Sequence, residues 1–277
     1  MKTILVPTDF SAASRNAAIH AIKIAEKLNA SLHFLHAFHL PVVTVEAEAF
    51  LLSETLDEIK SNADKELRQF IDDLMELKDS GLKYASEVKM GLALDEIEYS
   101  IKSTQASLIV MGTTGSSGLT KALIGSTTSS LISRVDIPVL AIPEEYLYNN
   151  YSKILLTSDF TSIKNIDVLN PLHEFAKEFK SELIILSVLN VEDDLPQSAK
   201  ALELLSITNY FSDFRLTVDT YYHHDAGKGI EEFASNVYPD LIVTIPHRKS
   251  WLEKLFSKSV TYEIANLAKF PLMTLPE

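Results

Sequence analysis

The chain has no cysteine and a shortage of positive charge, and each of these excludes a class of protein. Without cysteine there is no disulfide, thiolate zinc site, iron–sulfur cluster or cysteine nucleophile. Lysine and arginine total 25 against 38 aspartates and glutamates, so the formal net charge of −13 repels nucleic acid and anionic membrane surfaces. We therefore expect no nucleic acid and no membrane among the partners of this protein.

Long hydrophobic runs are also missing. The first apolar run, Ile4–Val6, ends at Pro7 and is too short for a signal peptide, and no later run has the length of a membrane span. Hydrophobic residues make up 46% of the 277 residues and charged residues 23%, which is typical of a globular protein with its own core. The sequence therefore predicts a cytoplasmic globular protein, long enough for two ordinary domains.

An internal repeat indicates two domains of the same kind. The segment Ile4–Ser11 (ILVPTDFS) returns 150 residues later as Ile154–Thr161 (ILLTSDFT). Three more pairs of segments recur in the same order: Ala30–Leu35 with Ser181–Leu186, Ser107–Val110 with Asp240–Val243, and Ile137–Leu140 with Phe270–Met273. Four matches in one order predict a tandem repeat.

The boundary between the copies falls in the segment Glu144–Tyr151. This segment is polar and aromatic and has neither glycine nor proline, so we expect a short packed connector rather than a flexible tether. The predicted domains are residues 1–146 and residues 152–277.

Each copy alternates short aliphatic runs with amphipathic helical patterns. Ser11 can cap a first helix, and helical spacing returns over Leu56–Leu77. The strand candidates of the first copy are Thr3–Pro7, Ser31–Ala37, Lys83–Val88, Ser107–Gly112 and Ile137–Ile142. This alternation predicts an α/β fold of two tandem doubly wound domains, each a five-stranded parallel sheet flanked by helices, with ligands at the carboxyl ends of the strands.

The last strand of each copy is an apolar edge that would invite aggregation if left open. These edges lie around Val139–Ala141 and Leu272–Thr274. We predict that they pair with each other across a pseudo-two-fold axis, which makes the second copy a built-in partner for the first. A homodimer of the whole chain is left open.

A glycine pattern follows the strand Ser107–Met111, with Gly112 and Gly115 and then Gly125 before Ser126. The first two glycines allow positive φ and close backbone approach, and Gly125, Ser126 and Thr127 offer unpaired amides at the start of a helix. Further hydroxyl donors come from Thr113, Thr114, Ser126 and Thr127. The pattern favours a phosphate cradle, although a loop that only turns the chain remains open.

The repeated segments and the glycine pattern together resemble those of the universal stress protein family in a tandem form. The domains of that family have the adenine nucleotide alpha hydrolase-like fold. The glycine signature of the first copy is that of the ATP-binding branch. The resemblance implies ATP in the N-terminal domain, with Mg²⁺ left open. By position it implies contacts from Pro7, Thr8, Asp9, Ala37, Met111, Gly112, Gly115, Gly125, Ser126 and Thr127.

Asp9 has several interpretations. Its carboxylate can hold Mg²⁺, accept a hydrogen bond from ribose or adenine, or cap the helix that starts near Ser11. It recurs as Asp159 in a copy without the glycine pattern, which a capping role explains in both copies.

The second copy lacks the cradle. The positions of the three glycines are taken by Ile245, Arg248 and Lys258, whose side chains occupy space that phosphate would need. We expect no ATP there by the family mode. The segment Pro246–Ser250 carries cationic groups, so it has two open interpretations. It binds an anion through its side chains, or it is a solvated or interface loop.

Neither catalysis nor a structural metal has a recognisable motif. The sequence contains no nucleophile elbow, and its histidines, such as His223 and His224, lack the spacing of a zinc site. We therefore predict a regulatory stress-response module that binds ATP. A weak ATPase and a nucleotide-free scaffold stay open, as does the role of the insertion Leu40–Leu52, which is a lid, a partner surface or a loosely packed loop.

Overall fold

The computed structural model describes residues 2–39, 49–75, 81–114, 125–157, 165–189, 197–245 and 269–276. The N-terminal half consists of β1 (Thr3–Pro7), α1 (Ala12–Leu28), β2 (Ser31–Phe38), α2 (Ala49–Met75), β3 (Tyr84–Met90), α3 (Ala93–Thr104), β4 (Ala106–Gly112), α4 (Ser126–Ile132) and β5 (Val139–Ile142). The C-terminal half consists of β6 (Lys153–Thr157), the 3₁₀-helix η1 (Ile166–Leu169), α5 (Asn170–Phe179), β7 (Glu182–Leu189), α6 (Gln197–Tyr210), β8 (Leu216–Tyr222), α7 (Ala226–Val237), β9 (Leu241–Thr244) and β10 (Leu272–Thr274).

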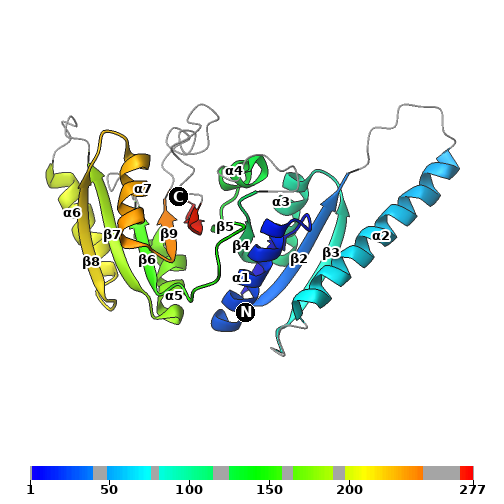
Figure 1. Ribbon diagram of the computed structural model, residues 1–277, viewed down its shortest axis with the longest axis horizontal. Helices are drawn as coiled ribbons and strands as arrows, with labels where there is room; N and C mark the ends of the chain where they lie inside the picture. The colour runs from blue at the N-terminus through cyan, green and yellow to red at the C-terminus, as the bar shows by residue number, and fades with distance from the viewer. Residues whose placement is uncertain are drawn as a thin grey trace.

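One ten-stranded sheet runs through both halves, in the order β3-β2-β1-β4-β5-β10-β9-β6-β7-β8. Within each half all neighbouring strands are parallel, and the second half repeats the strand order of the first (Figure 1). This is the doubly wound α/β arrangement that the alternating pattern predicts.

The halves meet through their last strands, the two apolar edges that the sequence predicts to pair. Strands β5 and β10 are antiparallel neighbours, and Leu140 lies opposite Met273 at the middle of the short ladder. Because β5 and β10 cover each other, neither is an open edge, and among the described strands β3 and β8 are the outermost.

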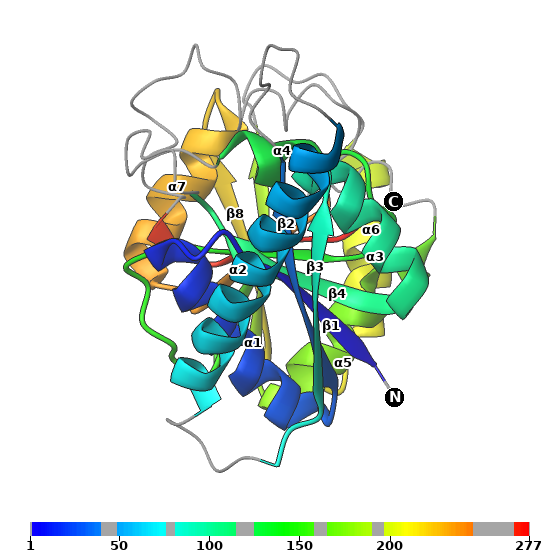
Figure 2. The same cartoon turned by 90° about the vertical axis from the view of Figure 1, so that its right-hand side faces the viewer.

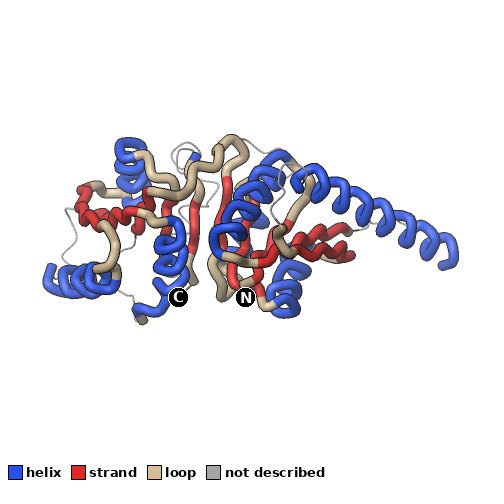
Figure 3. Tube along the Cα trace, turned by 90° about the horizontal axis from the view of Figure 1, so that it is seen from below, coloured by secondary structure: helices blue, strands red, loops and turns tan. Residues whose placement is uncertain are grey.

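Helices cover both faces of the sheet, as seen from the side and from below (Figures 2 and 3). One face is packed by α1, α2, α5 and α6, and the other by α3, α4 and α7. Each of the two apolar cores includes residues from both halves, so the core is continuous across the β5–β10 junction. Covered faces explain why the strands are almost wholly apolar in sequence.

Helix α1 begins where the sequence predicts a cap. The side chain of Ser11 accepts a hydrogen bond from the amide of Ser14, which satisfies one of the unpaired donors of the first turn. The buried face of the helix is made mostly of small residues, including Ala17, Ala18 and Ala21, which let its backbone approach the sheet closely.

The connector between the halves is packed, as its composition predicts. Tyr151 is fully buried, and the side-chain amide of Asn16 donates to the carbonyls of Pro143 and Tyr146 at 2.7 and 2.8 Å. His20 contributes two more contacts, from Nδ1 to the Tyr151 hydroxyl at 2.5 Å and from Nε2 to the Tyr146 carbonyl at 3.1 Å. Helix α1 therefore holds the connector against the first half.

The insertion Leu40–Leu52, for which a lid, a partner surface and a loosely packed loop are open, is helical at its end. Helix α2 already starts at Ala49, so the last part of the insertion is helical, and residues 40–48 lie outside the described structure. Figure 1 shows α2 extending well beyond the end of the sheet at the right of the view. The error is one of boundary, because apolar spacing becomes regular only from Leu56.

Candidate functional site

A pocket opens at the carboxyl ends of β1, β2 and β4, beside the start of α4. Strands β1 and β4 are neighbours at the point where the strand order reverses, which is where doubly wound sheets bind their ligands. The enclosed space of this open pocket measures about 150 Å³, roughly ten times the 10–15 Å³ that one water needs, so it has room for one ring of a larger ligand.

Nearly all residues singled out in the sequence meet in this pocket. It is lined by Pro7, Thr8, Asp9, Ser14, Leu35, Ala37, Ala93, Ile97, Met111, Gly112, Thr114, Gly125, Ser126, Thr127 and Thr128. Of the predicted site residues only Gly115 is missing from this set, because it lies outside the described residues. Their contact with a nucleotide stays a prediction.

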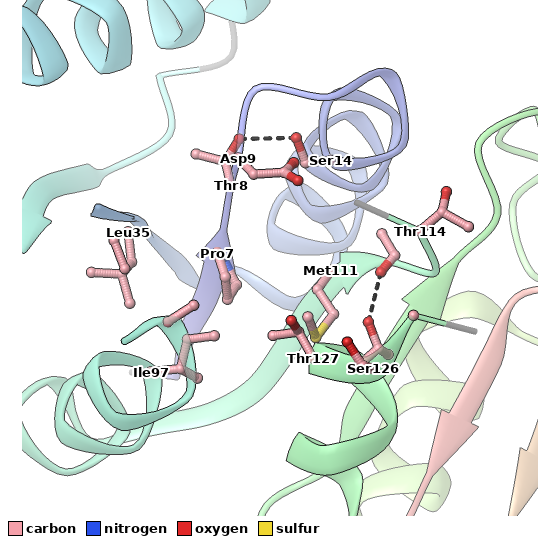
Figure 4. A pocket seen from close by; sticks show the side chains of 15 residues that line it. Pro7, Thr8, Asp9, Ser14, Leu35, Ile97, Met111, Thr114, Ser126 and Thr127 are labelled. Carbon is pink, nitrogen blue, oxygen red and sulfur yellow. Dashed lines mark hydrogen bonds between the residues drawn. The ribbon is translucent and has the colours of Figure 1, made fainter. Parts of the chain in front are cut away.

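The lining is divided between apolar and polar walls. Figure 4 shows Leu35 and Ile97 on one side of the pocket and Thr114 and Ser126 on the other. Among the described lining residues there is one carboxylate, Asp9, and no lysine or arginine. Such a lining suits a ligand with an apolar ring at one end and hydrogen-bond acceptors at the other.

The segment after β1 is held by short-range hydrogen bonds. Ser11 donates to Asp9 Oδ1 through its amide at 3.1 Å and through its hydroxyl at 2.6 Å. Thr8 and Ser14 share a hydrogen bond of 3.0 Å between their hydroxyls, which Figure 4 marks as a dashed line. Ser11, and not Asp9, is thus the helix cap, and Asp9 supports it from two residues before.

Phe10 lies in the left-handed region, with φ of 63°, although it is not glycine. Its ring stacks on His36 with 4.3 Å between centroids, and Nδ1 of His36 lies 2.9 Å from the carbonyl oxygen of Thr8. These contacts offset the cost of an unusual backbone angle at the rim of the pocket.

The close backbone approach expected at Gly112 is present, but the unpaired amide expected at Gly125 is not. Gly112 does not have a positive φ, and a Cβ there would lie 2.8 Å from the backbone carbon of Ala13, so its lack of a side chain serves the packing of α1 on β4. The amide of Gly125 is not unpaired, because it donates to the Thr113 carbonyl. Thr113 itself is buried and does not line the pocket.

Helix α4 is anchored to the end of β4. The hydroxyl of Thr128 donates to the carbonyl of Gly112 at 3.0 Å, and Gly125 precedes the first helical residue with extended backbone. This anchor brings Ser126 and Thr127 to the pocket wall.

Sequence reasoning missed several lining residues: Ser14, Leu35, Ala93, Ile97 and Thr128. Ser14 follows the cap Ser11 by one turn, so the predicted helix could have suggested it. Ile97 and Ala93 come from α3, which reaches the pocket only through tertiary packing, and no local pattern indicates that.

None of the described helices is long and apolar enough to cross a membrane. The described residues contain no group of three or more histidine or acidic side chains arranged to hold a metal ion.

The fold and the pocket define a doubly wound α/β protein with a pocket at the reversal of its strand order. Comparison with known proteins gives this class a family: the model of the universal stress protein family matches residues 1–143, just over half of the chain, and the chain belongs to that family. Universal stress protein MJ0531 of Methanocaldococcus jannaschii is 35% identical over 144 residues, which make up 51% of this chain and 81% of that protein.

Among solved structures, some match the whole chain and others match about half of it. A universal stress protein from Archaeoglobus fulgidus matches 99% of this chain and 98% of its own, with a TM-score of 0.71 at 18% identity, which shows a common fold across both halves. A universal stress protein solved in complex with cAMP matches 51% of this chain and 96% of its own, at 24% identity and a TM-score of 0.38.

Proposed function

We propose that the pocket in the N-terminal half binds ATP, and that the protein is a cytoplasmic, nucleotide-dependent regulatory module of the stress response. The observation that carries this proposal is that the site residues predicted from the sequence meet in one pocket. Nine of the ten positions that resemble the ATP-binding branch, all but Gly115, line one cavity at the strand-order reversal.

The lining residues fit the parts of a nucleotide. Leu35, Ala37 and Ile97 offer an apolar surface for the base, and the hydroxyls of Ser126 and Thr127 offer donors for phosphate or ribose oxygens. Since the described lining carries no cationic side chain, the phosphate charge needs a counterion, and Asp9 is the residue suited to hold Mg²⁺.

We further propose that residues 1–146 and 152–277 are two domains of one kind and that the second is a degenerate copy. Its repeated strand order supports this assignment. Ile245, at the position of Gly112, is buried with 1% of its surface exposed, whereas Arg248 and Lys258 lie outside the described residues. In this proposal the second copy binds no ATP and acts through β10 as the partner of β5.

The proposal is tested by denaturing freshly purified protein, identifying any released nucleotide by mass spectrometry, and titrating the nucleotide-free protein with ATP in a calorimeter. We expect about one adenine nucleotide per chain. Gly125→Leu, which fills the polar side of the pocket, should weaken ATP binding at least about tenfold, equivalent to about 1.4 kcal/mol. Phosphate release in the same samples separates binding from slow hydrolysis.

Ser133→Leu is the matched control. Ser133 is the exposed C-terminal cap of the same helix, α4, so this variant adds the same side chain away from the pocket and should bind ATP as the wild type does. A wild-type protein with neither bound nucleotide nor ATP affinity would replace the proposal with the nucleotide-free scaffold.

A further inference from the structure

A second cavity lies between the two halves, on the sheet face that α1 and α5 cover. It measures about 160 Å³ and has walls from β1, α1 and β4 of the first half and from α5 and β10 of the second. The residues that line it are Lys2, Ile4, Leu28, Ser107, Leu108, Pro138, Asn170, Pro171, Glu174, Phe175 and Met273. None of them lines the nucleotide pocket.

The inner surface of this cavity is apolar. Ile4, Leu108, Phe175 and Met273 are all buried and belong to the core that runs through both halves. An apolar cavity of roughly 150 Å³ has no polar partners to hold water, and such a cavity binds benzene or xenon in an engineered protein. The volume observed here is similar and the inner wall is apolar, whereas Lys2, Asn170 and Glu174 add polar groups to the rest of the lining.

The polar lining residues are tied to each other or to neighbours at the edge of the cavity. Lys2 forms an ion pair with Glu174 across the two halves, and both side chains are about half exposed. The amide oxygen of Asn170 accepts a hydrogen bond of 2.5 Å from the Tyr210 hydroxyl. An occupant therefore meets hydrocarbon inside the cavity and charge only at its opening.

We propose that this cavity is a binding site for a small apolar molecule, one aromatic ring or a short alkyl chain in size. The driving force is the transfer of the ligand's apolar surface from water to the apolar walls. Because both halves contribute walls, the site exists only in the paired arrangement of the full chain. The inference does not depend on nucleotide binding.

The test titrates the full-length protein with fluorobenzene and follows the ¹⁹F resonance of the probe. The wild type should show saturable binding of one fluorobenzene per chain. Leu28→Phe, which adds a ring to a residue that lines the cavity, should weaken this binding at least tenfold. Leu94→Phe makes the same change at a partly buried leucine on the opposite sheet face and should bind as the wild type does.

A second variant tests the site in the other direction. Phe175→Leu enlarges the cavity, so it should bind butylbenzene at least tenfold more tightly than the wild type does. Absence of saturable fluorobenzene binding to the wild type, or equal binding to Leu28→Phe, would overturn the proposal. If Leu28→Phe does not fold, an unchanged butylbenzene affinity in Phe175→Leu overturns it instead.

Discussion

The carboxylate of Asp9 accepts from Ser11, and Asp9 also lines the pocket that we propose to bind ATP, so one residue supports a helix cap and would hold Mg²⁺ in that proposal. Asp9→Asn separates these roles, because an asparagine oxygen still accepts from Ser11 but is a weaker ligand for Mg²⁺. We expect EDTA to lower the ATP affinity of the wild type by about tenfold or more and to have little effect on Asp9→Asn. Calorimetry with and without Mg²⁺ measures both.

The same titrations can also contradict a role of Asp9 in binding Mg²⁺. If Mg²⁺ changes the ATP affinity of wild type and Asp9→Asn equally, Asp9 acts only on the helix cap. Thr8→Val serves as a control, since it removes a hydroxyl from the same wall without changing charge.

His20 gives the protein a dependence on pH. Its Nε2 faces a carbonyl, which only accepts, so Nε2 carries the proton and Nδ1 accepts from Tyr151. Burial lowers the pKa of His20 to about 4, against a smaller opposing effect of the Tyr146 carbonyl. Between pH 4 and the unfolded-state pKa of about 6.5 the unfolded chain binds more protons, so stability is full above that range and falls as pH decreases through it.

We expect proton binding at His20 in the unfolded chain to lower the free energy of unfolding by at most about 3 kcal/mol between pH 7 and pH 4. Urea unfolding at a series of pH values measures this loss, and His20→Gln should flatten the slope. His224→Gln, at an exposed histidine, should keep the wild-type slope. An unchanged slope in His20→Gln would assign the acid sensitivity to other groups.

Residues with local roles could be predicted, and residues with distant partners could not. The cap at Ser11 depends on an amide three residues away, so the sequence is sufficient. Gly112 is required by Ala13, nearly a hundred positions earlier, and the left-handed Phe10 depends on stacking with His36. For these two residues the sequence pattern contains no sign of the partner.

At the scale of elements, the close contact between α1 and β4 connects the fold to the pocket. A methyl group at Gly112 would meet the Ala13 backbone, which cannot move without shifting the first turn of α1. Gly112→Ala should therefore destabilise the protein by about 1–3 kcal/mol. Chemical unfolding at pH 7 gives this value.

Gly91→Ala is the matched control. The three atoms nearest to a Cβ at Gly91 all belong to the side chain of Glu96, which can rotate away, so the loss should stay below about 1 kcal/mol. Equal losses in the two variants would mean that α1 adjusts its position freely.

The elements themselves follow from sequence to within a few residues where the burial pattern is strong. Strand β1 has the predicted bounds, and β4 differs by one residue at its start. Strand β5 begins two residues after the predicted Ile137, because Pro138 has no amide for the sheet ladder. The start of α2 was missed because regular apolar spacing begins only after its first turns.

At the scale of the whole molecule, pairing of the halves removes an edge that the first half alone would expose. A fragment of residues 1–146 keeps β5 but lacks β10, so its apolar edge is open. We expect this fragment to self-associate through β5 at micromolar concentrations, as sedimentation equilibrium would measure. A fragment that stays monomeric at about 100 μM would show that the open edge is tolerated.

During synthesis, β5 is made well before its antiparallel partner β10. Strand β5 ends at Ile142 and β10 begins at Leu272, about 130 residues later. At roughly 5–20 residues per second, the ribosome needs about 7–25 s to make the intervening chain. Throughout that interval the finished first half carries an open edge beside other nascent chains on the same messenger RNA, so the edge that closes the native fold is also the site where neighbouring polypeptides can pair wrongly.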